Sequence, residues 1–157
     1  MLAACAPVVV SAGKSIEMPR LTEDTYVAAD GAALALSVWP AAHGAPNTAP
    51  KAIILGLHGF GDYRDAFADP GPIWSQAGFV TYSYDQRGFG HSEKIRGAIA
   101  MQDMVSDIVA LLDGLGITAP VHATGAGVGA GTNGTGACVP GGGGLYGAGP
   151  PKFICLL

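Results

Sequence analysis

A continuous apolar run at residues 52–57 predicts a strand that is buried on both faces, as in a parallel sheet, and residues 79–84 form a second sheet-like run. Ahead of them, large apolar side chains alternate with smaller ones over residues 34–38, and Asp30-Gly31 is a strong turn signal. Together with residues 26–28, this pattern predicts an antiparallel hairpin that leads into the parallel part of the sheet.

The clearest helix is expected at residues 100–115, where apolar side chains recur at three- and four-residue intervals and form one stripe. The polar residues, Asp107 among them, fall on the opposite face. Gly116 is a suitable stop for this helix. The apolar stripe consists of Met101, Met104, Val105, Ile108, Leu111, Leu112 and Leu115.

A second helical segment is expected between these two predicted strands, at residues 66–77, where Pro70 and Pro72 should interrupt it. Another strand should begin at residues 120–123. Strands and helices therefore alternate along the chain, which indicates an α/β fold with a mostly parallel sheet. Ligands of such sheets bind beyond the carboxyl ends of the strands.

Composition divides the chain into three parts: a leader and linker at residues 1–20, a folded part at 21–124, and a tail at 125–157. Glycine fills 12 of the 25 positions from Gly125 to Gly149, and Lys152 is the one charged residue after Asp113. We expect this Gly-rich tail to be irregular, because glycine disfavours regular structure. The net charge of −4, without a basic patch, argues against nucleic acid as a partner.

The segment Leu2-Ala3-Ala4-Cys5 resembles a bacterial lipobox, whose cysteine is lipidated after signal cleavage. A lipoprotein signal has a charged start and an apolar stretch before that box, and here Met1 alone precedes it, as if the start codon had been placed too late. The other interpretation is chance in an Ala-rich stretch. With a lipidated Cys5 we expect attachment to a membrane of the bacterial cell envelope; without it, a cytoplasmic location.

Two Gly-containing turns follow the two predicted strands at residues 52–57 and 79–84. The first is Leu57-His58-Gly59-Phe60-Gly61-Asp62, and the second is Asp85-Gln86-Arg87-Gly88-Phe89-Gly90-His91-Ser92. Glycines on both sides of Phe60 allow a sharp turn that leaves a backbone N–H free for a developing oxyanion. Each motif alone could be a plain Gly-rich turn, so the spacing between the two motifs carries most of the information.

With this pair of motifs, residues Tyr26 to Thr124 resemble the α/β-hydrolase superfamily, and within it the lysophospholipase, monoacylglycerol-lipase and serine-aminopeptidase-like branch. The resemblance implies an incomplete α/β-hydrolase sheet and hydrolysis of acyl glycerol or lysophospholipid-type esters, with the Phe60 N–H as one oxyanion donor. It also implies that neither metal nor organic cofactor is needed. Structural loop roles are implied for His58, Gly59, Gly61, Asp85, Arg87 and Gly88.

The family's nucleophile is expected in a G-x-S-x-G turn directly after the strand at Val121. The chain has Gly125-Ala126-Gly127-Val128-Gly129 there, so Gly127 stands at the serine position. Glycine has no nucleophilic atom, which excludes covalent catalysis of the family type at this position. No Asp or Glu follows Asp113, and the last histidine, His122, precedes this turn. We therefore expect the chain itself to be inactive.

Two explanations of this departure stay open: a frameshift near residue 123, which the abrupt change of composition favours, and a genuinely degenerate hydrolase. Two rival functions also stay open. One is an α/β-hydrolase with an aspartate nucleophile, as in epoxide hydrolases and dehalogenases. The other is a non-catalytic fragment. The residue at position 127 in an undamaged gene separates the first rival from an esterase.

Overall fold

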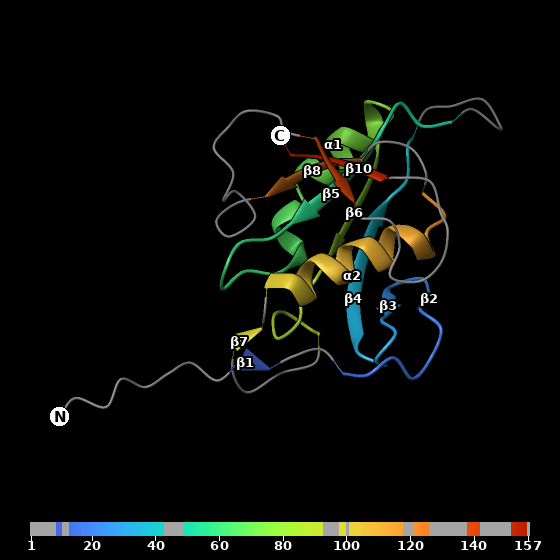
Figure 1. Ribbon diagram of the computed structural model, residues 1–157. Coiled ribbons are helices and arrows are strands. Elements are labelled where there is room, and N and C mark those ends of the chain that lie inside the picture. The colour runs from blue at the N-terminus through green and yellow to red at the C-terminus, as the bar shows by residue number, and fades with distance from the viewer. Residues whose placement is uncertain are drawn as a thin grey trace.

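A mixed eight-stranded sheet organises the computed structural model of the chain (Figure 1). The structure describes residues 9–10, 13–42, 49–92, 98–99, 101–117, 121–125, 138–141 and 152–156. Within these residues the strand order of the large sheet is β2-β3-β4-β6-β5-β8-β10-β9. Its strands are β2 (Arg20–Leu21), β3 (Thr25–Val27), β4 (Ala33–Trp39), β5 (Ile53–Leu57), β6 (Val80–Tyr84), β8 (Val121–Gly125), β9 (Cys138–Gly141) and β10 (Lys152–Leu156).

The predicted leading hairpin is present as β3 and β4, which pair antiparallel with Tyr26 opposite Leu34. Gly31 lies in the turn with a φ of 83°, which is the left-handed region that glycine occupies without strain. β4 then pairs antiparallel with β6, while β5 pairs parallel with both β6 and β8. A separate two-stranded parallel sheet joins β1 (Val9–Val10) to β7 (Ala98–Ile99).

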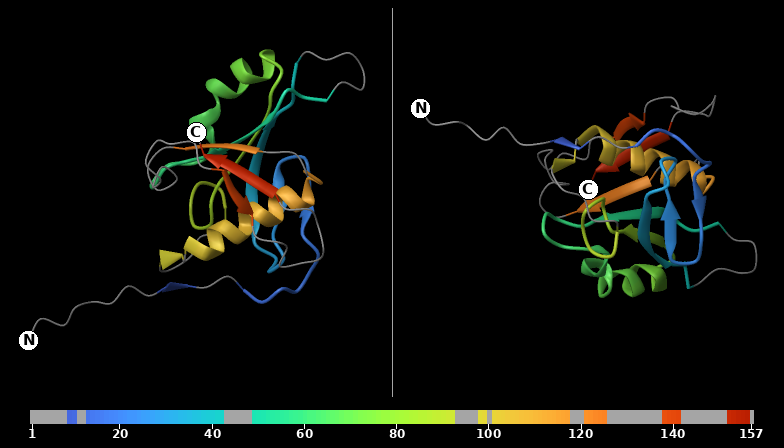
Figure 2. Two further views of the ribbon diagram at one scale, coloured as in Figure 1. Left: turned by 45° about the horizontal axis from the view of Figure 1, so that its top comes forward. Right: turned by 90° about the horizontal axis from the view of Figure 1, so that it is seen from below.

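Helices cover the sheet on both faces (Figure 2). One face packs against α2 (Met101–Gly114) and forms the main core, in which Leu55, Leu111 and Val121 are almost fully buried. The other face lies beneath the 3₁₀ helix η1 (Arg64–Phe67) and α1 (Pro70–Gln76). There the Phe67 ring lies so close to Gly56 that a Cβ at Gly56 would meet it at 2.8 Å.

Contrary to the sequence prediction, the prolines between β5 and β6 do not break a helix in its interior. Pro70 stands in the first turn of α1, so it begins the helix rather than breaking one. The fixed φ of proline suits this position, and its missing N–H would have had no helical acceptor there. The helical stretch is therefore divided into η1 and α1, with residues 68–69 between them.

The prediction for α2 is confirmed in its extent but is wrong for two residues. The helix runs from Met101 to Gly114, and Gly116 follows it with a φ of 63°. Asp107, which the periodicity places on the polar face, is only 5% exposed, whereas Val105 of the expected apolar stripe is 42% exposed. The buried position of Asp107 is explained by an ion pair from a distant loop, described below.

Two strands lie within the tail that we expected to be irregular. β10 pairs parallel with β8, and β9 pairs antiparallel with β10. β10 falls on the one apolar run of the tail, Phe153-Ile154-Cys155-Leu156, and β8 offers it an unpaired edge. Residues 126–137 and 142–150 lie outside the described residues, so for them the expectation of irregular structure stays a prediction.

Candidate active site

The loop after β5 is held in place by His58, which is only 2% exposed. The Gln86 backbone N–H donates to His58 Nε2 at 2.9 Å, and His58 Nδ1 lies 2.9 Å from the Gly59 carbonyl oxygen. An N–H group can only donate and a carbonyl oxygen can only accept, so Nε2 is the acceptor and Nδ1 carries the hydrogen. Gln86 returns a bond from its side-chain amide to the His58 carbonyl at 2.7 Å. These bonds occupy both ring nitrogens and tie the β5 and β6 loops together.

Phe60 presents its side chain outward while its backbone amide stays available. The ring is 82% exposed and packs edge-to-face on Phe89, with 5.5 Å between the ring centroids. Among the described residues, none accepts a hydrogen bond from the Phe60 N–H. Gly61 follows with a φ of 80°, which turns the chain sharply away from the strand. The loop thus offers a donor at the carboxyl end of β5.

The carboxyl end of β8 lies directly beside this loop. In the parallel ladder between β5 and β8, Gly125 is the register partner of Leu57, the residue before His58. A Cβ at Gly125 would lie 2.6 Å from the Leu57 carbonyl oxygen. The carboxyl ends of β5 and β8 therefore lie side by side, and the absence of a side chain at Gly125 permits this close approach. Gly127, the position of the expected nucleophile, lies outside the described residues.

Replacing Gly125 with alanine should therefore destabilise the chain, by about 1–3 kcal/mol, because backbone rather than a movable side chain blocks the new methyl group. Gly114 provides the control. A Cβ there would meet Leu21 at an ordinary 3.7 Å, and Gly114→Ala in a helix should stabilise the chain by about 0.5–1 kcal/mol. Urea unfolding followed by tryptophan fluorescence measures both effects. Equal effects of the two substitutions would contradict the tight β5–β8 contact.

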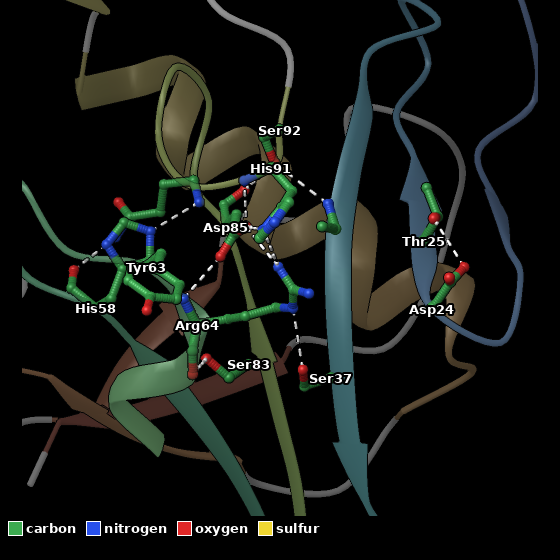
Figure 3. Close-up of polar contacts among 12 residues, drawn as sticks. Asp24, Thr25, Ser37, His58, Tyr63, Arg64, Ser83, Asp85, His91 and Ser92 are labelled. Carbon is green, nitrogen blue, oxygen red and sulfur yellow. Dashed lines mark hydrogen bonds and ion pairs between the residues drawn. The ribbon is translucent and has the colours of Figure 1, made fainter. Parts of the chain in front are cut away.

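Asp85, at the end of β6, is fully buried and is the centre of a polar cluster (Figure 3). Arg64 donates to it twice, from its backbone N–H at 2.7 Å and from its guanidinium at 2.6 Å. The His91 backbone N–H donates at 2.7 Å. The Asp85 carbonyl oxygen accepts a bond from the Ser92 hydroxyl at 2.6 Å. This cluster joins η1, which follows the Phe60 loop, to the loop after β6.

The charge state of Asp85 follows from these contacts. Burial alone would raise the pKa of its carboxyl, but the backbone N–H groups of Arg64 and His91 and the charge of Arg64 outweigh burial. The net result is a pKa below the usual range of an aspartate. Gly90 lies so close that a Cβ there would overlap the Asp85 carboxylate, and its φ of 50° also favours glycine. The conformation of this loop therefore fits Asp85 in its ionised form.

Arg87 joins three segments that are far apart in the sequence. Its guanidinium binds both oxygens of Asp107 on α2, at 2.6 and 2.8 Å. It also binds both oxygens of Asp30 in the hairpin turn, at 2.7 and 3.0 Å. The side chains of all three residues are 11% exposed or less. Such paired, bidentate contacts are the strongest that a guanidinium makes.

In this triad of Asp30, Arg87 and Asp107, burial raises the pKa of both carboxylates, but their net pKa shifts have opposite directions. At Asp30, burial raises the pKa. Arg87 and the backbone N–H groups of Gly13 and Ala32 lower it by more than burial raises it, so the net shift is downward. Asp107 is held at a raised pKa, because its burial outweighs the contribution of Arg87. Both groups face the same guanidinium, whose own pKa is raised by the two carboxylates against the effect of burial.

Sequence reasoning identified Asp85, Arg87 and the His58 loop but gave no role to Arg64, Asp30 as an ion-pair partner, or Asp107. Arg64 follows the first Gly-containing turn by a few residues, yet nothing in its local sequence shows that it meets Asp85. Asp107 could have been suspected from one signal only, its position three residues after Met104 in a helix whose buried faces were otherwise apolar. Gly88, with a φ of 82°, carries the turn that brings Arg87 into place.

Comparison with known proteins places this arrangement in a family. The sequence model of the family described as Serine aminopeptidase, S33, matches residues 48–132, which is more than half of the chain. The chain belongs to this family of α/β-hydrolases. The match begins just before β5 and ends after Gly127, so it includes both loops and the expected nucleophile position. The predicted superfamily and the α/β-hydrolase type of sheet are thereby confirmed.

Solved structures of other α/β-hydrolases are similar to this S33-family chain. A thermophilic esterase from Thermogutta terrifontis is 26% identical, with a TM-score of 0.52, and covers 66% of this chain and 35% of its own length. An enol-lactonase from Burkholderia xenovorans LB400 is 28% identical, with a TM-score of 0.51, over 60% of this chain and 34% of its own. A hydrolase from Pseudomonas aeruginosa PA01 is 25% identical, with a TM-score of 0.52, over 64% and 35%. The chain thus spans about a third of the length of these structures.

The described part of the chain holds neither a candidate membrane span nor a candidate metal site. None of the helices that the structure describes is long and apolar enough to cross a membrane. Within the same residues, no group of three or more histidine, cysteine, aspartate or glutamate side chains could hold a metal ion. The lipobox-like Cys5 lies outside the described residues, so the membrane attachment expected from it stays a prediction.

Proposed function

We propose that this chain carries the oxyanion side of a carboxylic ester hydrolase site and that Gly127 leaves that site without its nucleophile. The observation that supports the proposal most directly is the register that puts Gly125 beside Leu57, with the Phe60 N–H lacking an acceptor among the described residues. A hydroxyl presented two residues after Gly125 would attack an acyl carbon whose oxygen points at that N–H.

The chemistry of such a site follows from the charges that develop in it. When a nucleophile attacks an ester, the carbonyl oxygen becomes negative, and an amide that is already fixed in place stabilises that charge without reorganisation. The His58 contacts and the Asp85 cluster hold the Phe60 loop from two sides, which supplies this fixed geometry. In a chain with serine at position 127, the N–H of the following residue would be the second donor.

For the substrate, we propose acyl glycerols or lysophospholipid-type esters, small or lipidic, as the resemblance of the two loop motifs implies. The esterase and lactonase among the similar structures support ester chemistry in general. We further propose that Cys5 is lipidated and holds the protein at a bacterial envelope membrane, close to such substrates. Mass spectrometry of the protein purified from membranes tests this, since a diacylated Cys5 adds the mass of the lipid.

Inactivity of the chain is tested with the protein as it stands. We expect that it neither hydrolyses p-nitrophenyl butyrate faster than buffer nor becomes labelled by a fluorophosphonate, because both reactions need an activated hydroxyl. The purified Thermogutta terrifontis esterase serves as the positive control for both reagents. Turnover that a fluorophosphonate abolishes would show that a serine elsewhere in the chain is the nucleophile.

The ester-hydrolase assignment itself is tested by sequencing the gene across codons 115–130. A frameshift that, once corrected, restores serine at position 127 would support the esterase. Aspartate at that position would overturn the proposal in favour of the aspartate-nucleophile hydrolases. This experiment and the labelling experiment are independent, because one concerns the reaction class and the other the activity of this chain.

A further inference from the structure

The His58 ring can keep both of its hydrogen bonds only while it is neutral. Its Nε2 atom accepts from the Gln86 backbone N–H at 2.9 Å, and its Nδ1 atom donates to the Gly59 carbonyl oxygen at 2.9 Å (Figure 3). A second proton, on Nε2, would place two N–H donors opposite each other, and neither could accept. Protonation of the ring therefore replaces its bond to Gln86 with repulsion.

Among the described contacts, the ring has no counter-ion for a positive charge. His58 is buried, and the Phe89 ring packs edge-to-face with it, with 5.5 Å between the centroids. Asp85, next to Gln86 in the chain, is already engaged by Arg64 and by two backbone N–H groups. A buried charge without a partner is costly, so a protonated ring should move out into water. The charged or titratable side chains on the described segments next to the ring are Asp62, Arg64, Asp85, Arg87, His91 and His122.

We propose that His58 is an acid-sensitive switch of the loop that carries Phe60. Uptake of one proton at Nε2 breaks the bond to Gln86 and releases the ring from its buried position. Phe89 contacts both the His58 ring and the Phe60 ring, so the movement of His58 also removes the support of Phe60. The Phe60 N–H then loses its fixed direction. The inference concerns the regulation of the proposed site, and it rests on the proposed function only in assigning this N–H to an oxyanion.

The direction and steepness of the switch follow from the uptake of a single proton. Histidine in water has a pKa of about 6.5. Because the bonded ring is neutral and the released ring takes up a proton, the ratio of released to bonded loops should rise about tenfold for each pH unit below that value. Asp107 cannot imitate this loss, because its pKa, raised by burial, makes the chain more stable in acid. Asp30 and Asp85 have a lowered pKa and titrate in stronger acid.

Hydrogen exchange of the Gln86 backbone amide tests the switch on the full chain, because this N–H is the donor to Nε2. Between pH 7 and pH 5, its protection factor measured by NMR should fall about 25-fold. The Leu55 amide, in the fully buried middle of β5, reports unfolding of the whole sheet. Low concentrations of urea should accelerate exchange at Leu55 but not at Gln86, because release of a loop exposes little surface.

Two variants identify the ring that takes up the proton. His58→Gln keeps a side-chain oxygen that can accept from the Gln86 N–H but does not titrate, so the protection of Gln86 should become independent of pH over this range. His91→Gln removes a histidine whose side chain is 71% exposed and that lies on the same loop as Gln86. This second variant should leave the pH dependence unchanged.

Four outcomes would overturn the proposal. They are constant protection of Gln86 from pH 7 to pH 5, a pH dependence that persists in His58→Gln, one that is lost in His91→Gln, and exchange at Gln86 that follows urea as Leu55 does. If His58→Gln does not fold, the other three still decide. None of these measurements involves ester hydrolysis, so failure of the switch leaves the ester-hydrolase proposal to its own test by gene sequencing.

Discussion

Replacing Arg87 with methionine should destabilise the chain by about 4 kcal/mol or more, a larger loss than we expect from either Gly125→Ala or Asp85→Asn. Arg87 is the shared partner of Asp30 and Asp107, and its guanidinium makes four charge-assisted bonds to them. Its removal leaves two buried carboxylates that repel each other. Whole domains of ordinary size are stable by only about 5–15 kcal/mol, so such a loss approaches complete unfolding.

Two further variants separate this effect from a general sensitivity to the loss of arginine. Arg20 forms an ion pair with Glu17, but its side chain is 58% exposed, so Arg20→Met should change the stability by less than about 0.5 kcal/mol. Adding Asp30→Asn and Asp107→Asn to Arg87→Met should restore part of the lost stability, because the uncompensated charges are gone. Urea unfolding measures all four proteins. An Arg87→Met variant as stable as the parent would contradict the role of the triad.

Replacing Asp85 with asparagine should destabilise the chain by about 3 kcal/mol at neutral pH, because it leaves the Arg64 guanidinium, 19% exposed, without its carboxylate. The asparagine can still accept a bond from one N–H group but offers no charge. The loop that carries Phe60 should lose order together with η1. Far-ultraviolet circular dichroism should retain most of its signal, since the core under α2 does not include Asp85.

The pH dependence of this effect has a definite sign. The pKa of Asp85 is lower in the folded chain than its ordinary value of 3.8, so its ionised form favours folding. That contribution is fully present above pH 3.8 and is lost as the pH falls through the lowered value. The difference in unfolding free energy between parent and Asp85→Asn should therefore shrink on acidification. A difference that stays constant from neutral pH into strong acid would contradict an ionised, paired Asp85.

Asp30 and Asp107 modify the acid response of the parent in opposite directions. Asp30 has a lowered pKa and contributes stability that is lost in acid, as Asp85 does. Asp107 has a raised pKa, so its contribution is present at low pH and is lost as the pH rises through the raised value. The comparison of Asp85→Asn with the parent cancels both contributions, which makes it the cleaner measurement.

The elements that could be predicted from the sequence are those fixed by local patterns. The sheet-like runs of β5 and β6, the Asp30-Gly31 turn and the helix α2 each follow from residues that are near one another in the chain. Contacts between distant segments could not be predicted in this way. The burial of Asp107 depends on Arg87, twenty residues earlier, and an isolated helical pattern places any aspartate on the solvent side.

The same limit explains the candidate site. The glycines and the His58 loop can be recognised as a motif in the sequence, because a close approach of two backbone segments requires glycine. Arg64 belongs to no such sequence motif, since its role depends on where η1 places it relative to Asp85. In the tail, glycine content alone predicted irregular structure, whereas the partner strand β8 makes an ordered β10 favourable. The glycines lie at residues 125–149, whereas β10 itself has strand-favouring residues such as Phe153 and Ile154, so the prediction was wrongly extended to it.

We propose that position 127 lies next to the Phe60 amide, and a spin label tests this proposal most directly. Gly127→Cys is labelled with a nitroxide in a chain whose Cys5, Cys138 and Cys155 are replaced by serine. The label should broaden the amide NMR signals of residues 59–61. The same label at Met18→Cys, an exposed residue just before the edge strand β2, should leave those signals sharp. Sharp signals from residues 59–61 with the label at position 127 would contradict the account.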